Sequence, residues 1–143
     1  MWIGFDNRPR FFTKIKLFLV DVGLLSSMVR LKQGTLLDGN ELFKEFKGAL
    51  TEQYVLQQLI TLKGLNTYYW TNDRGSAEID FVVDNGNAVI PIEVKAETNL
   101  KAKSLKTYRE RFQLSIRTSM ADYKREEWLL NLPLYAIEAM NNL

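Results

Sequence analysis

Two apolar runs that flank an Asn-Gly-Asn break, between residues 77 and 95, constrain the fold of this chain more than any other stretch. The runs read E-I-D-F-V-V-D and A-V-I-P-I-E-V-K. Apolar runs on either side of such a break predict a β-hairpin. The period of two then assigns the residues of the first strand to opposite faces: Ile79, Phe81 and Val83 to one, Glu78, Asp80 and Val82 to the other.

The turn of this hairpin decides which acidic residues face each other. The four-residue loop 85–88, or its central Gly-Asn pair, places Asp80 opposite Glu93. A turn at the Asn-Gly pair places Glu78 opposite Glu93 instead, and Asp80 is then diagonal to Glu93. In both registers Lys95 lies one step further along the face of Glu93. Because two facing carboxylates repel unless a proton or a cation lies between them, either register predicts a site at this hairpin.

The absence of histidine and cysteine from the 143 residues limits the chemistry that such a site can perform. It excludes Ser-His-Asp and Cys-His catalytic arrangements, zinc sites built on imidazole or thiolate, and a disulfide scaffold. Any catalysis is therefore expected to use carboxylates, lysines, hydroxyl groups and a hard metal ion. The chain also contains no Gly-x-x-x-x-Gly-Lys-[Ser/Thr] sequence, and hence no nucleotide-binding P-loop.

The beginning of the chain contains no visible targeting signal, because charged residues and a proline interrupt its apolar residues. Its longest apolar run, Leu17 to Val20, is far too short to cross a bilayer. We therefore expect a cytoplasmic protein without membrane contact. The formal net charge of +2 is too small to indicate a nucleic-acid partner by itself.

Apolar periodicity predicts the elements around the hairpin. Residues 41–62 repeat apolar side chains at three- and four-residue spacing, which predicts the longest helix. The other candidates are strands at residues 65–70, 114–118 and 127–130, a helix at 104–112, and a strand or helix at 134–140. The core order αβββαβ predicts an α/β fold with helices on both faces of the sheet.

The segment before this core, residues 1–40, is predicted to be an N-terminal extension. Its aromatic and basic start is expected to be a docking segment, and residues 16–20 are expected to form a short strand. Asp21 is a suitable N-cap for a helix that runs to about Lys32. Residues 41–143 form the predicted domain that carries the site.

Glu52 lies on the apolar side of the predicted helix 41–62, together with Val55 and Leu59. A carboxylate on a buried side needs a partner or a metal ion. The alternative is a position at the rim, where Glu52 reaches solvent, and the helical pattern alone favours this alternative.

A basic stretch follows the hairpin. Six basic residues occur between residues 95 and 111, against two acidic ones. A solvated helix face is the commoner meaning of such a stretch, and phosphate binding is the more specific one. The candidates for nucleic-acid binding are Lys101, Lys103, Lys106 and Arg109.

The candidate residues follow one another in a recognisable order. A helix glutamate, Glu52, precedes a strand aspartate, Asp80, and a Glu-x-Lys sequence starts thirteen residues after that aspartate. This series resembles the PD-(D/E)XK nuclease superfamily, which includes restriction endonucleases and has a core of the same αβββαβ order.

A longer series of segments resembles the uncharacterised C-terminal domain of a large prokaryotic family of AAA+ ATPases. The segments are K-L-F-L-V-D-V-G-L-L, G-A-L-T-E-Q-Y-V, Y-Y-W-T, E-I-D-F-V-V, I-P-I-E-V-K and S-L-K-T-Y. This likeness extends over residues 16–137, which is nearly the whole chain.

The nuclease resemblance implies a role for each matching residue. Asp80 and Glu93 would bind magnesium or manganese together with the backbone carbonyl of Val94. Lys95 would orient the attacking water or help to deprotonate it, and Glu52 would hold the metal directly or through water. Magnesium suits these residues because it prefers carboxylate and water oxygens and lowers the pKa of bound water.

Three functional interpretations follow. The first is a magnesium-dependent nuclease-like domain that acts on DNA and is the C-terminal part of, or a partner to, an AAA+ ATPase. The second is a catalytically inactive nuclease-fold module that binds nucleic acid or regulates an ATPase. The third is a structural ion-pair cluster of Asp80, Glu93 and Lys95. The first is preferred because the four-residue set is complete, and the chain is expected to be part of a longer protein or an independently encoded remnant.

Overall fold

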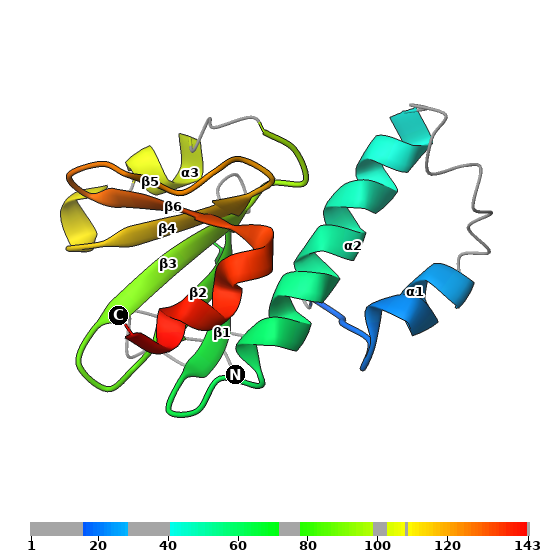
Figure 1. Ribbon diagram of the computed structural model, residues 1–143, viewed down its shortest axis with the longest axis horizontal. Helices are drawn as coiled ribbons and strands as arrows, with labels where there is room; N and C mark the ends of the chain where they lie inside the picture. Colours follow the sequence, from blue (N-terminus) through cyan, green and yellow to red (C-terminus); the bar gives the residue numbers. More distant parts are fainter. Residues whose placement is uncertain (1–15, 29–40, 72–77, 99–102, 108, 143) are drawn as a thin grey trace.

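A computed structural model describes residues 16–28, 41–71, 78–98, 103–107 and 109–142. It contains a six-stranded mixed sheet with the strand order β1-β2-β3-β4-β6-β5 (Figure 1). The strands are β1 (Asn66–Thr71), β2 (Glu78–Asp84), β3 (Val89–Val94), β4 (Ser115–Ser119), β5 (Lys124–Arg125) and β6 (Leu129–Pro133). The helices are α1 (Val22–Met28), α2 (Glu41–Leu59) and α3 (Lys103–Thr107), with the 3-10 helices η2 (Arg109–Arg111) and η3 (Leu134–Asn142). The predicted α/β class is confirmed.

The β2–β3 hairpin turns through residues 85–88. The Asn85 side chain holds the turn, since its Oδ1 accepts hydrogen bonds from the backbone N–H groups of Asn87 (3.0 Å) and Ala88 (2.8 Å). Gly86 adopts a φ of +83°, a conformation that glycine takes without steric cost. The loop therefore has four residues, and the prediction of a two-residue Asn-Gly turn is wrong.

The pairing of β2 with β3 selects one of the two predicted registers. Phe81 lies opposite Ile92, and the strands stay in step from there to the turn. This is the register that the four-residue loop predicts, and it is confirmed as far as Phe81 and Ile92. The pairing ends there, one position before Asp80 and Glu93, so the direct pairing of these two residues stays a prediction. The alternative with Glu78 opposite Glu93 is wrong.

The predicted faces of β2 are confirmed for Phe81 and Val83, which share one hydrophobic cluster, and wrong for Ile79, because the strand changes its alternation next to Asp80. β1 pairs with β2 at Tyr68–Val82 and at Trp70–Ile79. Two steps along β1 thus match three steps along β2, which marks a β-bulge. Ile79 packs with Val82 in the smaller of two hydrophobic clusters. The extra residue allows Asp80 to point towards the face of the sheet that α2 covers.

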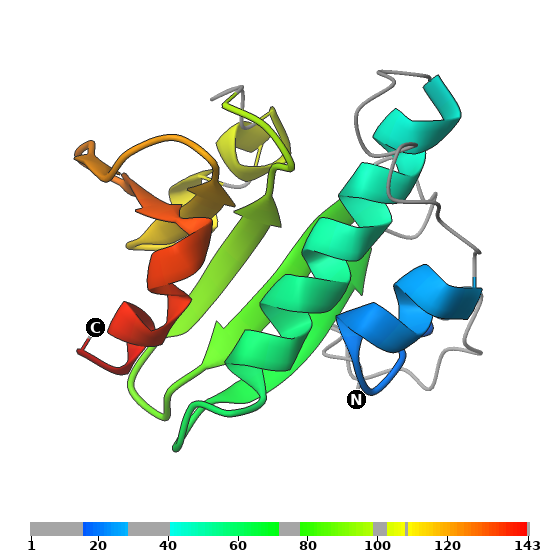
Figure 2. The same cartoon turned by 45° about the vertical axis from the view of Figure 1, so that its right-hand side comes forward.

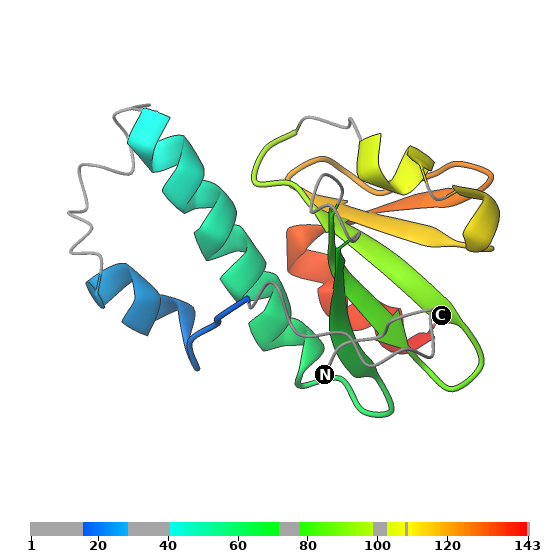
Figure 3. The ribbon, with the colours of Figure 1, turned by 180° about the vertical axis from the view of Figure 1, so that it is seen from behind.

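Two hydrophobic clusters lie on opposite faces of the sheet. The larger one packs beneath α2 and η3 and includes Leu59, Ile92 and Ile116 (Figure 2). The smaller one includes Leu105 of α3, which lies on the other face (Figure 3). Helices on both faces agree with the layered arrangement that the sequence predicts.

The segment before α1 docks on α2 without forming the predicted strand at residues 16–20. The Gln53 side-chain amide accepts a hydrogen bond from the Leu19 N–H at 2.8 Å and donates one to the Leu19 C=O at 2.6 Å. Gln53 thus satisfies the two backbone groups that a neighbouring strand would otherwise bind. Asp21 is the N-cap of α1, as predicted, because its Oδ1 accepts a hydrogen bond from the Leu24 N–H at 2.9 Å. The predicted end of this helix lies outside the described residues.

The second half of the sheet is more elaborate than predicted. β3, β4 and β6 run parallel, and the short strand β5 pairs with the outer edge of β6. The predicted helix 104–112 is divided into α3 and η2, and the final candidate segment is the 3-10 helix η3. No helix within the described part of the chain is long and apolar enough to cross a membrane. The division into residues 1–40 and 41–143 stays a prediction.

Candidate functional site

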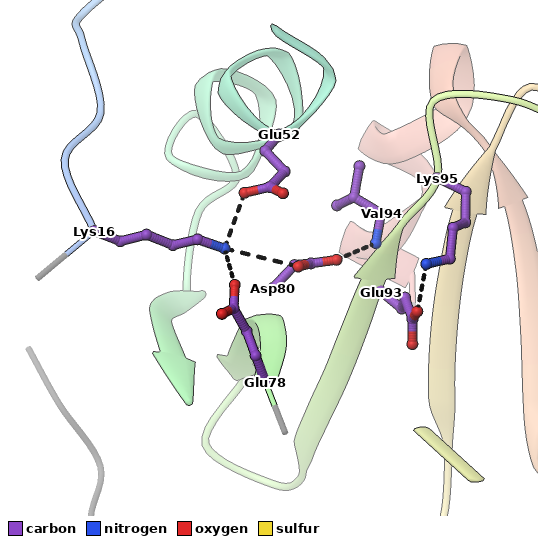
Figure 4. Close-up of polar contacts among 7 residues, drawn as sticks. All are labelled: Lys16, Glu52, Glu78, Asp80, Glu93, Val94 and Lys95. Carbon is purple, nitrogen blue, oxygen red and sulfur yellow. Dashed lines mark hydrogen bonds and ion pairs between the residues drawn. The ribbon is translucent and has the colours of Figure 1, made fainter. Parts of the chain in front are cut away.

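The candidate site lies where β2 begins and β3 ends. These antiparallel strands bring Asp80 beside the end of β3, which carries Glu93 and is followed by Lys95 (Figure 4). Glu52 approaches from α2 and is joined to Asp80 through Lys16. The structure thus brings the four predicted catalytic residues into one region, and their catalytic roles stay predictions.

Asp80 connects the two strands beyond their last pair. Its Oδ2 accepts a hydrogen bond from the backbone N–H of Val94 at 2.8 Å. Burial raises the pKa of Asp80 to about 6, and the negative charge of Glu52 adds to this effect. The Val94 hydrogen bond and the charge of Lys16 act in the opposite direction but do not cancel it. Asp80 is therefore ionised at neutral pH in surroundings that compensate its charge incompletely.

Lys16 gathers three carboxylates on the α2 side of the sheet. Its Nζ lies 2.9 Å from Oε2 of Glu52, 2.8 Å from Oε1 of Glu78 and 3.7 Å from Oδ1 of Asp80. Burial by itself would lower the pKa of Lys16, but the close ion pairs with Glu78 and Glu52 outweigh burial and raise it. Lys16 is therefore charged, and Glu52 is a partly exposed residue with a cationic partner.

Glu93 and Lys95 form the other half of the site. The Lys95 Nζ lies 2.6 Å from Oε1 of Glu93. Glu93 is 5% exposed, and its Oε2 is buried with no hydrogen-bond partner in the described part of the chain. Because a buried carboxylate oxygen without a partner costs free energy, this oxygen is the clearest open acceptor of the site.

Arg117 is a neighbour of the site that the sequence did not indicate. It lies beside Glu93 in the parallel pairing of β3 and β4, and its side chain is buried. Its Nε donates a hydrogen bond to Oδ1 of Asn131 at 2.9 Å. Burial lowers the pKa of Arg117, while the charges of Glu126 and Glu93 oppose this shift. A second positive charge thus lies on the Glu93 side of the sheet.

Lys16 was also missed as a site residue. Its only signal in the sequence is its place at the start of K-L-F-L-V, one of the segments of the ATPase-domain resemblance. Nothing in that segment indicates that the lysine reaches a strand more than sixty residues away.

The roles of the four predicted nucleic-acid residues stay predictions. Lys106 in α3 and Arg109 in η2 are exposed, whereas Lys101 lies outside the described residues and Lys103 begins α3. The Arg109 guanidinium lies over the Trp128 ring at 5.4 Å from its centroid, and 3.4 Å from Oε2 of Glu127. Arg109 therefore has local partners that compete with a phosphate group.

The binding of magnesium or manganese at the site stays a prediction. In the described ranges, no group of three or more Asp, Glu, His or Cys side chains could hold a metal ion. Magnesium needs only one or two carboxylates, because it keeps several of its own waters. The chemistry of Asp80 and Glu93 is compatible with that smaller number of ligands, and the buried Glu93 Oε2 has no hydrogen-bond partner in the described part of the chain.

Comparison with known proteins matches the chain to a protein family. No curated protein and no solved structure matches the chain significantly. A family profile matches residues 47–136, which run from α2 to η3 and include all four predicted catalytic residues. The match covers more than half of the 143 residues. The chain therefore belongs to the family described as the domain of unknown function DUF4143.

Proposed function

We propose that the chain is a magnesium-dependent, nuclease-like domain that acts on DNA. The observation that carries this proposal is the hydrogen bond from the Val94 N–H to Asp80, which ties the start of β2 to the residue after Glu93, with the Lys95 ammonium 2.6 Å from the Glu93 carboxylate. The chain order α2, β1, β2, β3, α3, β4 matches the αβββαβ order of the restriction-endonuclease core and supports the same proposal.

In this proposal Asp80, Glu93 and the Val94 carbonyl would hold magnesium or manganese. The ion, when bound, would lower the pKa of a water molecule and neutralise charge on a phosphate. The chain itself supplies orientation, since the Val94 N–H holds one oxygen of the Asp80 carboxylate in place. Lys95 has the reach and the charge to orient an attacking water next to Glu93.

The DNA backbone would pass the α3–η2 segment. This segment follows β3 and exposes Lys106, so phosphate contacts there would release counterions and make binding strongly salt-dependent. Lys106→Glu should weaken DNA binding several-fold. Lys63→Glu is the matched control, because Lys63 is also exposed but lies in the turn after α2. Equal losses in the two variants, or affinity unaffected by salt, would count against this surface.

A catalytically inactive module is the second candidate, and the contacts of Lys16 favour it. This lysine already neutralises part of the charge of Asp80 and Glu52 without a metal ion. The family is often associated with AAA ATPases, which supports an ATPase module as the partner in either case. Such a module would bind DNA or regulate the ATPase and would cut nothing.

Incubation of the purified chain with branched, single-stranded and duplex DNA, with and without magnesium or manganese, separates the candidates. The nuclease proposal expects cleavage only with metal, and none by Glu93→Gln or Lys95→Ala. Glu138→Gln, an exposed residue of η3 outside the site, is the control that should retain cleavage. DNA binding without cleavage in any condition would favour the inactive module. A melting temperature that ignores millimolar metal would favour a structural ion-pair cluster.

A further inference from the structure

Lys16 places a positive charge among the acidic residues of the site. Its ammonium contacts Glu52 and Glu78 closely and Asp80 at 3.7 Å, the longest of the three distances (Figure 4). The Asp80 carboxylate thus has one oxygen next to Lys16 and the other bonded to the Val94 N–H. Both oxygens of a predicted metal ligand are therefore engaged by the chain itself.

Contacts on α2 and β2 hold the segment that carries Lys16. We use the name strap for residues 16–21. The buried Gln53 binds both backbone groups of Leu19, and the Gln57 side chain lies 3.3 Å from Oδ2 of Asp21. Phe18 packs against Phe81 with ring centroids 5.7 Å apart. These contacts keep the Lys16 ammonium at the site without using Glu93 or Lys95.

We propose that Lys16 is an internal competitor of the divalent cation, and that the strap must release the Lys16 ammonium from Asp80 before the ion binds fully. The inference rests on the proposed function in one respect, that Asp80 and Glu93 bind a divalent ion. The physical reason is charge. The ammonium repels a nearby divalent ion, and it removes part of the negative charge that would attract one.

The long Asp80 contact makes this exchange feasible. Lys16 can lose its contact with Asp80 while it keeps the much shorter contacts with Glu52 and Glu78. The ammonium would then remain paired while Oδ1 of Asp80 becomes available. The strap thus protects the metal-free site from the repulsion among its carboxylates and opposes loading of the ion.

Titration calorimetry with magnesium chloride and with manganese chloride tests the inference on the whole chain. Lys16→Met keeps most of the apolar stem and removes the charge, so it should bind the ion about ten-fold more tightly than wild type. Its melting temperature without metal should be lower and should rise further on saturation. Lys16→Arg should bind as wild type does. Lys124→Met is the matched control, because Lys124 is on the edge strand β5, away from β2 and β3, and pairs with Glu126 just after that strand.

The outcomes separate this inference from the proposed function. Equal or weaker binding by Lys16→Met would overturn the competition, and so would an absence of binding by both Lys16→Met and wild type. Tighter binding without any DNA cleavage would support the competition and contradict the nuclease activity. Should Lys16→Met fail to fold, lysine-labelled wild type gives a second measurement by NMR. The Lys16 side-chain resonance should shift on magnesium addition, and an unchanged resonance would overturn the inference.

Discussion

The two halves of the candidate site differ in how the chain assembles them. Glu93 and Lys95, the strand pair, are two residues apart, on β3 and directly after it. Lys16, Glu52, Glu78 and Asp80, the Lys16 cluster, come from the strap, α2 and β2. An extended backbone alone brings alternate residues to one face, so the strand pair needs no other element. The Lys16 cluster exists only when three segments pack together.

The two halves also differ in burial. In the strand pair the Glu93 side chain is 7% exposed and Lys95 is 33% exposed, whereas the carboxylate side chains of the Lys16 cluster are 17% to 46% exposed. The difference in burial therefore lies in the carboxylates. An ion pair that is partly solvated contributes less than a buried one when a partner is removed. Single substitutions should therefore cost more stability in the strand pair than in the Lys16 cluster.

The largest effect is expected from Lys95→Met, which leaves the buried Glu93 carboxylate without its lysine. We expect the free energy of unfolding of the metal-free chain to fall by about 2–3 kcal/mol, measured by urea unfolding at neutral pH. The double variant Glu93→Gln/Lys95→Met should recover most of this loss. A loss that persists in the double variant would mean that the lysine stem, and not the ion pair, stabilises this half.

Asp80→Asn should have the opposite sign and stabilise the metal-free chain by about 1–2 kcal/mol at neutral pH. The carboxyl has a pKa of about 6 in the fold because of burial and the charge of Glu52. Its unfolded pKa is about 4. The stability that the protonated group contributes is therefore complete below about pH 4 and is lost as the pH rises through about 6.

The pH dependence of this variant tests the explanation. Unfolding measured at several pH values should show that the gain from Asp80→Asn shrinks as the pH falls from 7 towards 4, because wild type is protonated there. Asparagine keeps an oxygen that can accept the hydrogen bond from the Val94 N–H, so the variant retains this contact and differs from wild type in charge. If the gain in stability did not depend on pH, or if the variant were less stable than wild type at neutral pH, the charge of Asp80 would not be incompletely compensated in the fold.

Gln53→Leu should have a smaller effect and act on the Lys16 cluster indirectly. It removes the hydrogen bonds to both backbone groups of Leu19, so we expect a loss of about 1 kcal/mol and faster hydrogen exchange of the Leu19 amide. Gln57→Leu loses longer bonds, of 3.2 and 3.3 Å, and should lose less stability. Unchanged exchange at Leu19 would mean that other contacts hold the strap.

The smallest effect is expected from Glu127→Gln, at an ion pair outside both halves. Glu127 and its partner Arg109 are 87% and 53% exposed, and the pair is long at 3.4 Å. We expect a change below about 0.5 kcal/mol in thermal unfolding. A loss of stability as large as that of Lys95→Met would contradict the expectation that removing a buried ion pair destabilises the fold more than removing an exposed one.

The sequence by itself determined the features that depend on near neighbours. The hairpin and one of its two predicted registers follow from apolar alternation and from the Asn-Gly-Asn break, whose Asn85 side chain closes the turn. The Asp21 N-cap and the long helix α2 follow from equally local signals. The pairing of Lys95 with Glu93 follows from their spacing, because side chains two residues apart share a face of a strand.

Only the tertiary structure decided where these pieces meet. The bulge next to Asp80 depends on how β1 pairs with β2, and it overrides the simple period of two. The position of Lys16 depends on Gln53, which replaces strand pairing for Leu19 and so prevents the predicted strand. Arg117 reaches Glu93 only through the parallel pairing of β3 and β4. Each of these contacts joins residues far apart in the chain, and neither residue propensity nor periodicity carries information about which distant partner a side chain will meet.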